Sequence, residues 1–412
     1  MPENDGPMTP PGISRVHSEE ASRPAATGRA RLDSIDLLRG AVMVLMALDH
    51  VRDYFGNAAV DPTNPATATA ALFLTRWVTH FCAPVFFLLT GTGACLAGRR
   101  RTTAALSRFL LARGVWFLVL ELFVMRFAWQ FNVDYQVTVL TVLWALGWAL
   151  IVLAGLVYLP AAVVAAVGVA MIASHNLLDG IPAAAFGRAA PLWSVLHAPG
   201  VLYSDGRHLM FAAYPLIPWI GVVAAGYGLG RIFSWERARR RSLLLRLGAA
   251  MTAAFLVLRA VNVYGDPRPW VHVAGATALS FLNTTKYPPS LLFLLMTLGP
   301  ALLFLRAVDG RTPAWLRPVL VFGRVPMFYY VLHVFVMHLL AVAVCQWRFG
   351  SMRWMFESPG LGQYPVTQPP GWPLPLPYVY LCWLVVVLTL YPVCRWFAAV
   401  KQRRSDWWLS YL

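Results

Sequence analysis

Long apolar runs recur along this chain of 412 residues, and they constrain its fold more than any other feature. Each run has roughly 18 to 26 residues, enough for a helix to cross a hydrocarbon core of about 30 Å. Since 58% of the residues are hydrophobic and only 13% are charged, one water-soluble core could not bury them. The runs therefore predict a polytopic membrane protein. The predicted spans cover residues 35–55, 72–97, 106–129, 137–158, 160–178, 210–233, 243–264, 286–306, 321–345 and 375–399.

The predicted fold class is all-α, a bundle of about ten transmembrane helices. A helix satisfies its own backbone hydrogen bonds in lipid, whereas an open sheet would leave backbone groups unpaired. Residues 1–30 are rich in Pro, Ser, Ala, Glu and Arg and lack the apolar core of a signal peptide, which predicts a disordered cytoplasmic tail. Residues 31–400 then form one transmembrane domain, and residues 401–412 form a short cytoplasmic tail.

The formal charge of +16 is spread over alternate loops, so it does not indicate a nucleic-acid-binding protein. Every second loop collects arginines, and the intervening loops carry both signs of charge. Because Arg-rich loops stay in the cytoplasm, both termini are predicted to lie inside and the number of spans to be even. This pattern predicts a multi-pass protein of the cell (inner) membrane. The predicted inner clusters lie at residues 29–31, 99–101, 237–241, 306–317 and 401–404.

Cysteines and histidines give no sign of a disulfide framework or a metal centre. The five cysteines are an odd number and lie inside or at the ends of apolar runs. His333 and His338 lie about 140° apart around one predicted helix, so they do not face a common site. The sequence therefore predicts no metal site. His333, the deeper of the two, is either a buried structural histidine or part of the substrate site.

The first predicted span carries more ionisable residues than any other, and such residues are costly inside a membrane unless they have a function. Their spacing of three and four residues places them on one helical stripe. Two of them, Arg39 and His50, lie about 16 Å apart along the helix axis. A face that is polar at both ends and apolar between them should point into the bundle. The stripe consists of Asp36, Arg39, Met43, Met46, His50 and Asp53.

His50 is the candidate general base, because an imidazole can take up a proton near neutral pH. Asp53, one turn further, is the candidate to hold the tautomer of His50 or to stabilise its imidazolium. Asp49 precedes His50 and joins this catalytic group. The alternative interpretation is that residues 49–53 form an interfacial polar cap where the helix leaves the membrane.

The second predicted span adds Arg76 and His80, one turn apart and at the same outer level as the candidate base. Pro84 predicts a kink in this span. The run Thr90–Ala94 contains two glycines and predicts close helix packing; without a preceding strand or a following Lys it does not indicate a phosphate-binding loop. Lys286 opens the eighth span, where it is either interfacial or lines a substrate mouth.

Four stretches of the sequence match motifs of a known family. They are RLDSIDLLRG at residues 31–40 followed by Asp49 and His50, APVFFLLTG at residues 83–91, KYPPS at residues 286–290, and FGRVPMFYY at residues 322–330. Together they resemble bacterial members of the heparan-α-glucosaminide N-acetyltransferase catalytic-domain family, within the wider transmembrane acyltransferase superfamily. The resemblance covers most of residues 31–340.

The resemblance implies a helical bundle that moves an acyl group from cytoplasmic acyl-CoA to an acceptor on the far side. The lysosomal member of the family is understood to use an Asn at the outer end of this first helix and a His in the following loop. Here His50 stands at the Asn position and residues 51–61 contain no His, so either His50 takes that role or the chemistry differs. The predicted catalytic residues are His50, Asp49 and Asp53, and the predicted acyl-CoA- and substrate-binding residues are Arg31, Ser34, Asp36, Arg39, Arg76, His80, Lys286 and His333.

The resulting hypothesis is acyl transfer with acyl-CoA as co-substrate and no bound cofactor. His50 would remove a proton from an acceptor hydroxyl or amine, while Arg39 and other cytoplasmic arginines attract the CoA phosphates. The expected partners are membrane lipid, acyl-CoA and a sugar or other acceptor, with no nucleic acid; a homo-oligomer and an acyl-histidine intermediate stay open. The alternative is a secondary transporter or exporter of an anionic solute, with Arg39, His50 and His333 as a proton relay.

Overall fold

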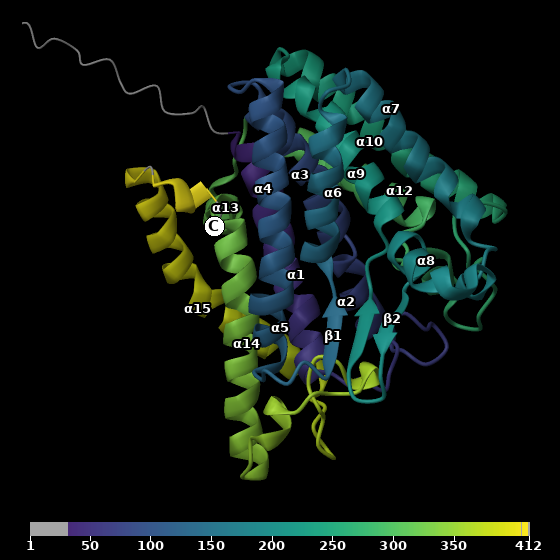
Figure 1. The fold of residues 1–412 in the computed structure, drawn as a ribbon, viewed down its shortest axis with the longest axis vertical. Helices are drawn as coiled ribbons and strands as arrows, with labels where there is room; N and C mark the ends of the chain where they lie inside the picture. Colours follow the sequence, from purple (N-terminus) through teal and green to yellow (C-terminus); the bar gives the residue numbers. More distant parts are fainter. Residues whose placement is uncertain (1–31, 405, 411–412) are drawn as a thin grey trace, which may run out of the picture. The chain divides into compact units, whose positions relative to one another are not determined.

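A computed structural model describes residues 32–404 and 406–410 of the chain. The predicted tail 1–30 and Arg31 lie outside the described residues. Helices dominate the part that is described, and the protein is an all-α polytopic membrane protein, as predicted (Figure 1). The helices are α1 Asp33–Phe55, α2 Ala70–Thr79, α3 Cys82–Gly98, α4 Thr103–Val119, α5 Arg126–Gln130, α6 Val142–Leu156, α7 Ala161–Ser174, α8 Ala190–Leu196, α9 Leu216–Leu229, α10 Arg237–Val261, α11 Thr277–Leu282, α12 Leu291–Val308, α13 Arg317–Arg324, α14 Pro326–Phe349 and α15 Leu376–Arg403.

Seven helical segments of the described chain are long and apolar enough to cross a membrane. One segment consists of α2 and α3 together, and the other six are α7, α9, α10, α12, α14 and α15. Each of the seven matches a predicted span. The other three predicted spans correspond to α1, to the helix that continues from α4 through a π-helical turn at Leu120–Met125 into α5, and to α6. The predicted division at Pro160 is confirmed, because α6 ends before this residue and α7 begins after it.

The second span is interrupted before its proline. The helix stops after Thr79 and resumes at Cys82, so His80 and Phe81 form the break. Pro84 explains the position, because it has no N–H to donate to the carbonyl of His80, four residues earlier, and its ring clashes with that carbonyl. The break lies one turn before the proline, and His80 and Phe81 keep helical dihedral angles there; the kink itself stays a prediction.

A small three-stranded sheet, which the sequence did not predict, replaces the expected helical start of two spans. Strand β1 (Val137–Leu140) pairs parallel with β3 (Leu209–Ala212), and β2 (Gly200–Ser204) pairs antiparallel with β3. The predicted spans 137–158 and 210–233 are therefore wrong at their first residues, which form β1 and β3 and not helix. The β-branched run Val137-Thr138-Val139 favours a strand, and Pro215 precedes the start of α9.

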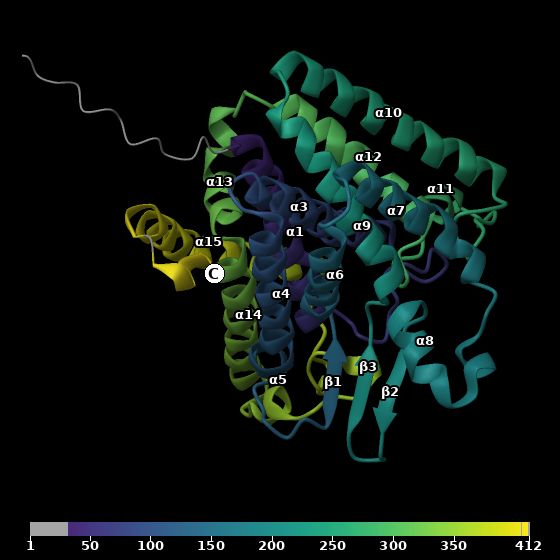
Figure 2. The same ribbon diagram turned by 45° about the horizontal axis from the view of Figure 1, so that its top comes forward.

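Helix α1 lies at the centre of the bundle and packs against α2, α3, α12, α13, α14 and α15. Its contact with α13 is unusually close. A Cβ added to Gly40 would lie 2.1 Å from the carbonyl oxygen of Val319, and one added to Gly323 would lie 1.8 Å from that of Asp36. Only glycine allows this approach. Figures 1 and 2 show α15 beside α14 on one flank, with α10 and α12 packed together on the other.

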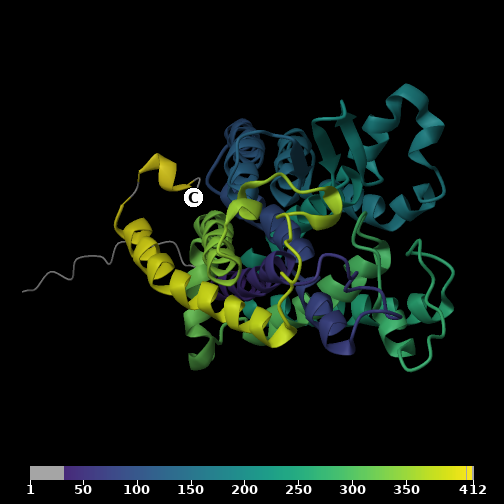
Figure 3. The same ribbon diagram turned by 90° about the horizontal axis from the view of Figure 1, so that it is seen from below.

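The loops predicted to be extracytoplasmic gather at one end of the bundle. The sheet and the segment that joins α14 to α15 lie there, at the bottom of Figure 1 and on the near side in Figure 3. Asn132 donates to the carbonyl of Phe356 at 3.1 Å, and Ser358 donates to Asp134 at 2.7 Å. Burial alone would raise the pKa of Asp134, but hydrogen bonds from the Gln136 N–H and the Ser358 hydroxyl hold it below its ordinary value.

The loops predicted to be cytoplasmic meet at the opposite end. Arg240, at the start of α10, forms a two-pronged ion pair with Asp309 after α12, at 2.9 and 3.0 Å. Arg99 donates to the carbonyl of Gly230, and Arg324 donates to Asp33. The alternation of loops that the charge pattern predicts is therefore compatible with the packing of the helices.

Candidate active site

The end of α1 that is predicted to be extracytoplasmic opens into a cavity of about 340 Å³, called here the outer cavity. Asp49, His50 and Asp53 line it from α1, Arg76 lines it from α2, and Lys286 lines it from the turn before α12. Three distant parts of the sequence thus supply its polar groups. Much of the remaining wall is aromatic, with Trp129, Tyr214, Tyr287, Tyr330 and Tyr364.

His50 is hydrogen-bonded to His333, and the two form what is called here the histidine pair. His50 Nδ1 lies 2.8 Å from His333 Nε2, and His333 Nδ1 lies 2.5 Å from the carbonyl oxygen of Tyr330. A carbonyl can only accept, so His333 carries its proton on Nδ1 and its Nε2 accepts from His50 Nδ1–H. Neutral His50 therefore keeps its lone pair on Nε2. That nitrogen is available to a reacting group in the cavity.

In the described chain His333, and not Asp53, is the hydrogen-bond partner of His50, so Asp53 does not hold the tautomer; its alternative role of stabilising the imidazolium stays a prediction. The Asp53 carboxylate accepts from Arg52 Nη2 at 2.6 Å, and His333 supplies the hydrogen bond to His50 instead. The direction of side chains on a helix explains the difference. Long side chains lean back toward the N-terminus, which turns the His50 ring away from the following turn, where Asp53 lies.

Asp49 is held by its neighbours and is not placed as a proton acceptor. Its carboxylate accepts from Arg76 through both oxygens, from Arg52 at 3.0 Å and from Thr79 at 2.9 Å. Lys286 Nζ lies 3.9 Å from the same carboxylate. A carboxylate that receives this many donors stays ionised and fixes its cationic partners. Asp49 thus positions Arg76 and Lys286 at the cavity wall.

His80 lies beside the outer cavity without lining it. His80 is 3% exposed, and its ring packs edge-on against Phe293 with ring centroids 5.3 Å apart. Neither ring nitrogen has a hydrogen-bond partner among the residues that the structure describes. His80 lines a neighbouring cavity of about 580 Å³, whose wall also includes Asp53, Arg76 and Lys286. Arg76 and His80 were both predicted on the second span, but only Arg76 lines the outer cavity together with His50.

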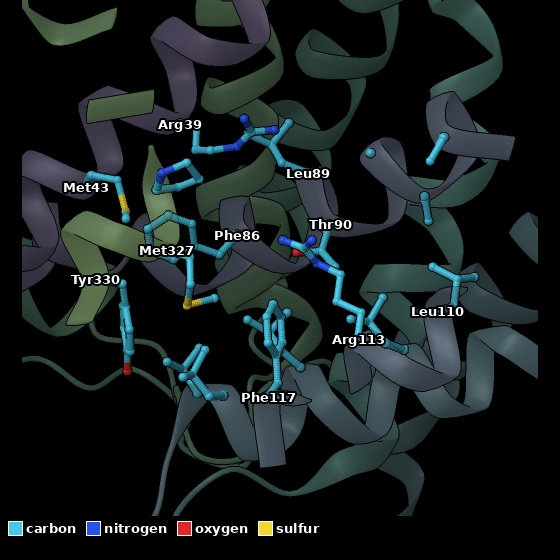
Figure 4. Close-up of a pocket in the computed structure, with 18 of the residues that line it drawn as sticks. Arg39, Met43, Phe86, Leu89, Thr90, Leu110, Arg113, Phe117, Met327 and Tyr330 are labelled. Carbon is cyan, nitrogen blue, oxygen red and sulfur yellow. The ribbon is translucent and has the colours of Figure 1, made fainter. Parts of the chain in front are cut away.

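A second cavity of about 310 Å³, called here the inner cavity, lies along the other half of α1. Four cationic side chains line it: Arg39 from α1, Arg113 from α4, Arg324 from α13 and Lys401 from α15. No carboxylate is among the described residues of its wall. Figure 4 shows Arg39 at the upper edge of this cavity, Arg113 on the right and Tyr330 at the lower left. The arrangement suits an anion.

The other residues predicted near the start of α1 have different positions. Arg39 donates to Asp36 at 3.0 Å and to the carbonyl of Gly323 at 3.2 Å, so Asp36 holds Arg39 and does not line the cavity itself. Ser34 is buried in the first turn of α1 and is absent from the described walls of both cavities. Arg31 lies outside the described residues.

The two cavities share a wall formed by Phe86, Val142 and Tyr330, each of which lines both. The stripe on α1 passes this wall: Met43 lines the inner cavity and Met46 lines the outer cavity. The face predicted to point into the bundle does so. It connects a cationic cavity along the N-terminal half of α1 with the histidine pair near the C-terminal end of the helix.

Four functional candidates escaped the sequence interpretation: Arg113, Arg324, Lys401 and Tyr330. Arg113 lies in the middle of a predicted span, and its charge inside an apolar run was a signal that was available. Tyr330 belongs to a motif noted in the sequence, but no spacing rule indicates that it divides two cavities, because its neighbours Phe86 and Val142 come from other helices.

Comparison with models of protein families shows a match to heparan-alpha-glucosaminide N-acetyltransferase, catalytic, over residues 31–266. This range is more than half of the 412 residues and contains α1 through α10. It confirms the resemblance carried by the motifs at residues 31–40 and 83–91. The motifs at residues 286–290 and 322–330 lie beyond the matched range. A search of curated proteins finds no match to this chain.

Proposed function

Because the chain belongs to the heparan-alpha-glucosaminide N-acetyltransferase catalytic family of membrane acetyltransferases, we propose that it transfers an acetyl group from acetyl-CoA to an extracytoplasmic acceptor. The observation that carries the proposal is the shared wall of Phe86, Val142 and Tyr330 between the cationic inner cavity and the histidine pair. A thioester that enters from the inner cavity and passes this wall meets His50. Donor and acceptor then approach the reaction centre from opposite membrane surfaces.

The inner cavity is the proposed site of the CoA moiety. Its cations Arg39, Arg113, Arg324 and Lys401 match the phosphates of CoA, and guanidinium groups pair well with phosphate oxygens. The separation of Arg39 from His50, about 16 Å by helix rise, is one that an extended pantetheine arm can span. The apolar stretch at Met43 and Met46 suits that arm. CoA thus serves as a co-substrate and not as a resident cofactor.

His50 is the proposed general base. Its Nε2 takes the proton from an acceptor hydroxyl or amine as the acceptor oxygen or nitrogen forms a bond to the thioester carbonyl carbon. The C–S bond then breaks, and the leaving thiolate of CoA takes the proton back from the His50 imidazolium. His333 is a positioning residue: its Nε2 keeps the proton of His50 on Nδ1 throughout. Atoms and charge balance without a further reactant.

Tyr330 is the proposed donor to the developing oxyanion. Its hydroxyl is buried, lies on the wall that the thioester must pass, and makes no hydrogen bond of ordinary geometry within the described chain. Removing a donor that points to where negative charge develops, in a site shielded from water, lowers kcat by a factor of about 10²–10³ in comparable sites. The cationic side chains of Arg76 and Lys286 add positive potential from the outer wall.

The outer cavity is the proposed site of the acceptor. Aromatic rings with a few fixed polar groups, such as Asp53 and Lys286, are the mixture expected for a small-molecule site, and they suit a sugar hydroxyl or amine. The structure supports a small acceptor or the end of a glycan, because the cavity holds about 340 Å³.

The test is transfer of labelled acetyl from acetyl-CoA to candidate amino sugars in proteoliposomes, with donor and acceptor on opposite sides. His50→Ala should lower kcat by about 10²–10⁴. Arg113→Gln should raise KM for acetyl-CoA by about 10- to 100-fold, since a charge-assisted hydrogen bond contributes about 1.5–3 kcal/mol. The matched control is His208→Ala, an exposed histidine of the β2–β3 turn that lines neither cavity.

The same vesicles separate acyl transfer from the transporter alternative. Flux of an anionic solute without release of CoA, abolished by His50→Ala, would establish transport and overturn the proposal. Release of CoA that requires both an acceptor and His50 would establish transfer.

A further inference from the structure

Three side chains with metal-ligating atoms meet outside both cavities, beyond the predicted outer end of α7. His175 caps α7, Asp179 follows the 3₁₀ turn His175–Leu178, and His197 caps α8. One ligand atom from each lies within 4.8 Å of the other two. The closest described pair is His197 Nε2 and Asp179 Oδ1, at 3.0 Å. The acyl-transfer mechanism uses none of these groups.

The two imidazoles are buried and leave hydrogen-bonding atoms unused. His175 is 1% exposed and His197 is 2% exposed. Both ring nitrogens of His175 and Nδ1 of His197 lack a partner of ordinary hydrogen-bond geometry in the described chain. Buried polar atoms normally have partners, because an unsatisfied one is costly. The two unused nitrogens of buried His175, one of whose ring nitrogens lies within 4.8 Å of ligand atoms of Asp179 and His197, are therefore an observation that points to a ligand.

Neighbouring groups hold the three side chains in place. Asn176 Nδ2 donates to Asp179 Oδ2 at 2.7 Å, which leaves Oδ1 directed into the cluster. Asn176 Oδ1 accepts from the backbone N–H of Leu291 at 2.9 Å, at the start of α12. The cluster thus has the supporting shell of a metal site.

We propose that His175, Asp179 and His197 bind a divalent transition-metal ion of the Zn²⁺ type. Two imidazole nitrogens and one carboxylate oxygen are a ligand set that zinc takes, with a fourth position for water. Calcium and magnesium prefer all-oxygen sites, so this set selects against them. The ligand atoms would draw together until each lies about 2.0–2.2 Å from the ion. The Asp179 side chain, 17% exposed, gives the ion a path from solvent.

One of the three ligands is close in the chain to the wall of the outer cavity. His197 lies two residues before Pro199, which lines that cavity. A bound ion would therefore stiffen the wall from behind. This effect on acyl transfer depends on the proposed function, whereas metal binding itself does not.

The test uses the full chain in nanodiscs after removal of metals with a chelator. Co²⁺ should bind with one ion per chain and give the strong visible absorption of a tetrahedral site, and Zn²⁺ should displace it. Zn²⁺ should also raise the Tm of the stripped protein. A wild-type chain that binds no Co²⁺ in stoichiometric amount, or gives only the weak spectrum of hydrated ions, would overturn the proposal whatever its acyltransferase activity.

Variants assign the ligands. His175→Ala, Asp179→Asn and His197→Ala should each weaken Co²⁺ binding by at least about 100-fold, and Asn176→Ala should weaken it by about 10- to 100-fold. The matched control is His208→Ala, because His208 pairs with Asp205 at the same 3.0 Å but lies exposed on a turn. Unchanged affinity in all three ligand variants would refute the assignment. The wild-type titration decides the matter if a variant fails to fold.

Discussion

From the hydrogen bond between His50 and His333 we derive a quantitative prediction for the variant His333→Leu. This change removes the acceptor that keeps the proton of His50 on Nδ1, 2.8 Å away. A buried donor that loses its partner costs about 1–3 kcal/mol, and each 1.4 kcal/mol corresponds to a factor of ten. The productive tautomer of His50 should therefore become scarcer, and kcat should fall by about 5- to 150-fold. This loss is smaller than the about 10²–10⁴ expected for His50→Ala.

The assay is steady-state acetyl transfer from labelled acetyl-CoA, with kcat and KM determined separately. KM for acetyl-CoA should not change in His333→Leu, because His333 lies outside the described wall of either cavity. His333→Gln is the matched variant, since its amide oxygen can accept from His50 where Nε2 does now. It should retain kcat to within about tenfold of wild type. Thermal unfolding of both variants checks that the bundle remains intact.

Two outcomes would refute this reasoning. Wild-type kcat in His333→Leu would show that the hydrogen bond between the histidines has no role in the reaction. An equal loss of kcat in His333→Leu and His333→Gln would show that the shape of the histidine matters and that its acceptor atom does not.

Two predictions concern stability. Gly91→Ala should lower the Tm, because the added Cβ would lie 1.9 Å from the carbonyl oxygen of Val223 and push α3 away from α9. The expected cost is about 1–3 kcal/mol. Gly93→Ala is the control: its added Cβ would have nothing within 4 Å, so the Tm should stay unchanged or rise. Asp309→Asn should cost about 3–5 kcal/mol by leaving Arg240 buried without its ion pair, and an unchanged Tm in thermal unfolding would contradict this.

Much of the architecture could be predicted because lipid imposes a simple rule. Spans of fixed length, the division at Pro160 and the alternation of arginine-rich loops follow from hydrocarbon thickness and charge, which act on each segment separately. The sheet formed by β1, β2 and β3 could not be predicted in this way. Its strands are short, and β1 meets β3 only after the chain has passed through α6, α7 and α8.

The same distinction between local sequence rules and tertiary contacts applies to the candidate site. The sequence by itself determined the stripe on α1, and thus that Arg39 and His50 face one interior, because helical periodicity fixes which residues share a face. Tertiary structure alone decided that His333 rather than Asp53 holds His50, that Phe86, Val142 and Tyr330 separate two cavities, and that His175, Asp179 and His197 converge. These contacts join residues from different helices and turns, and their geometry depends on packing, which no local period encodes.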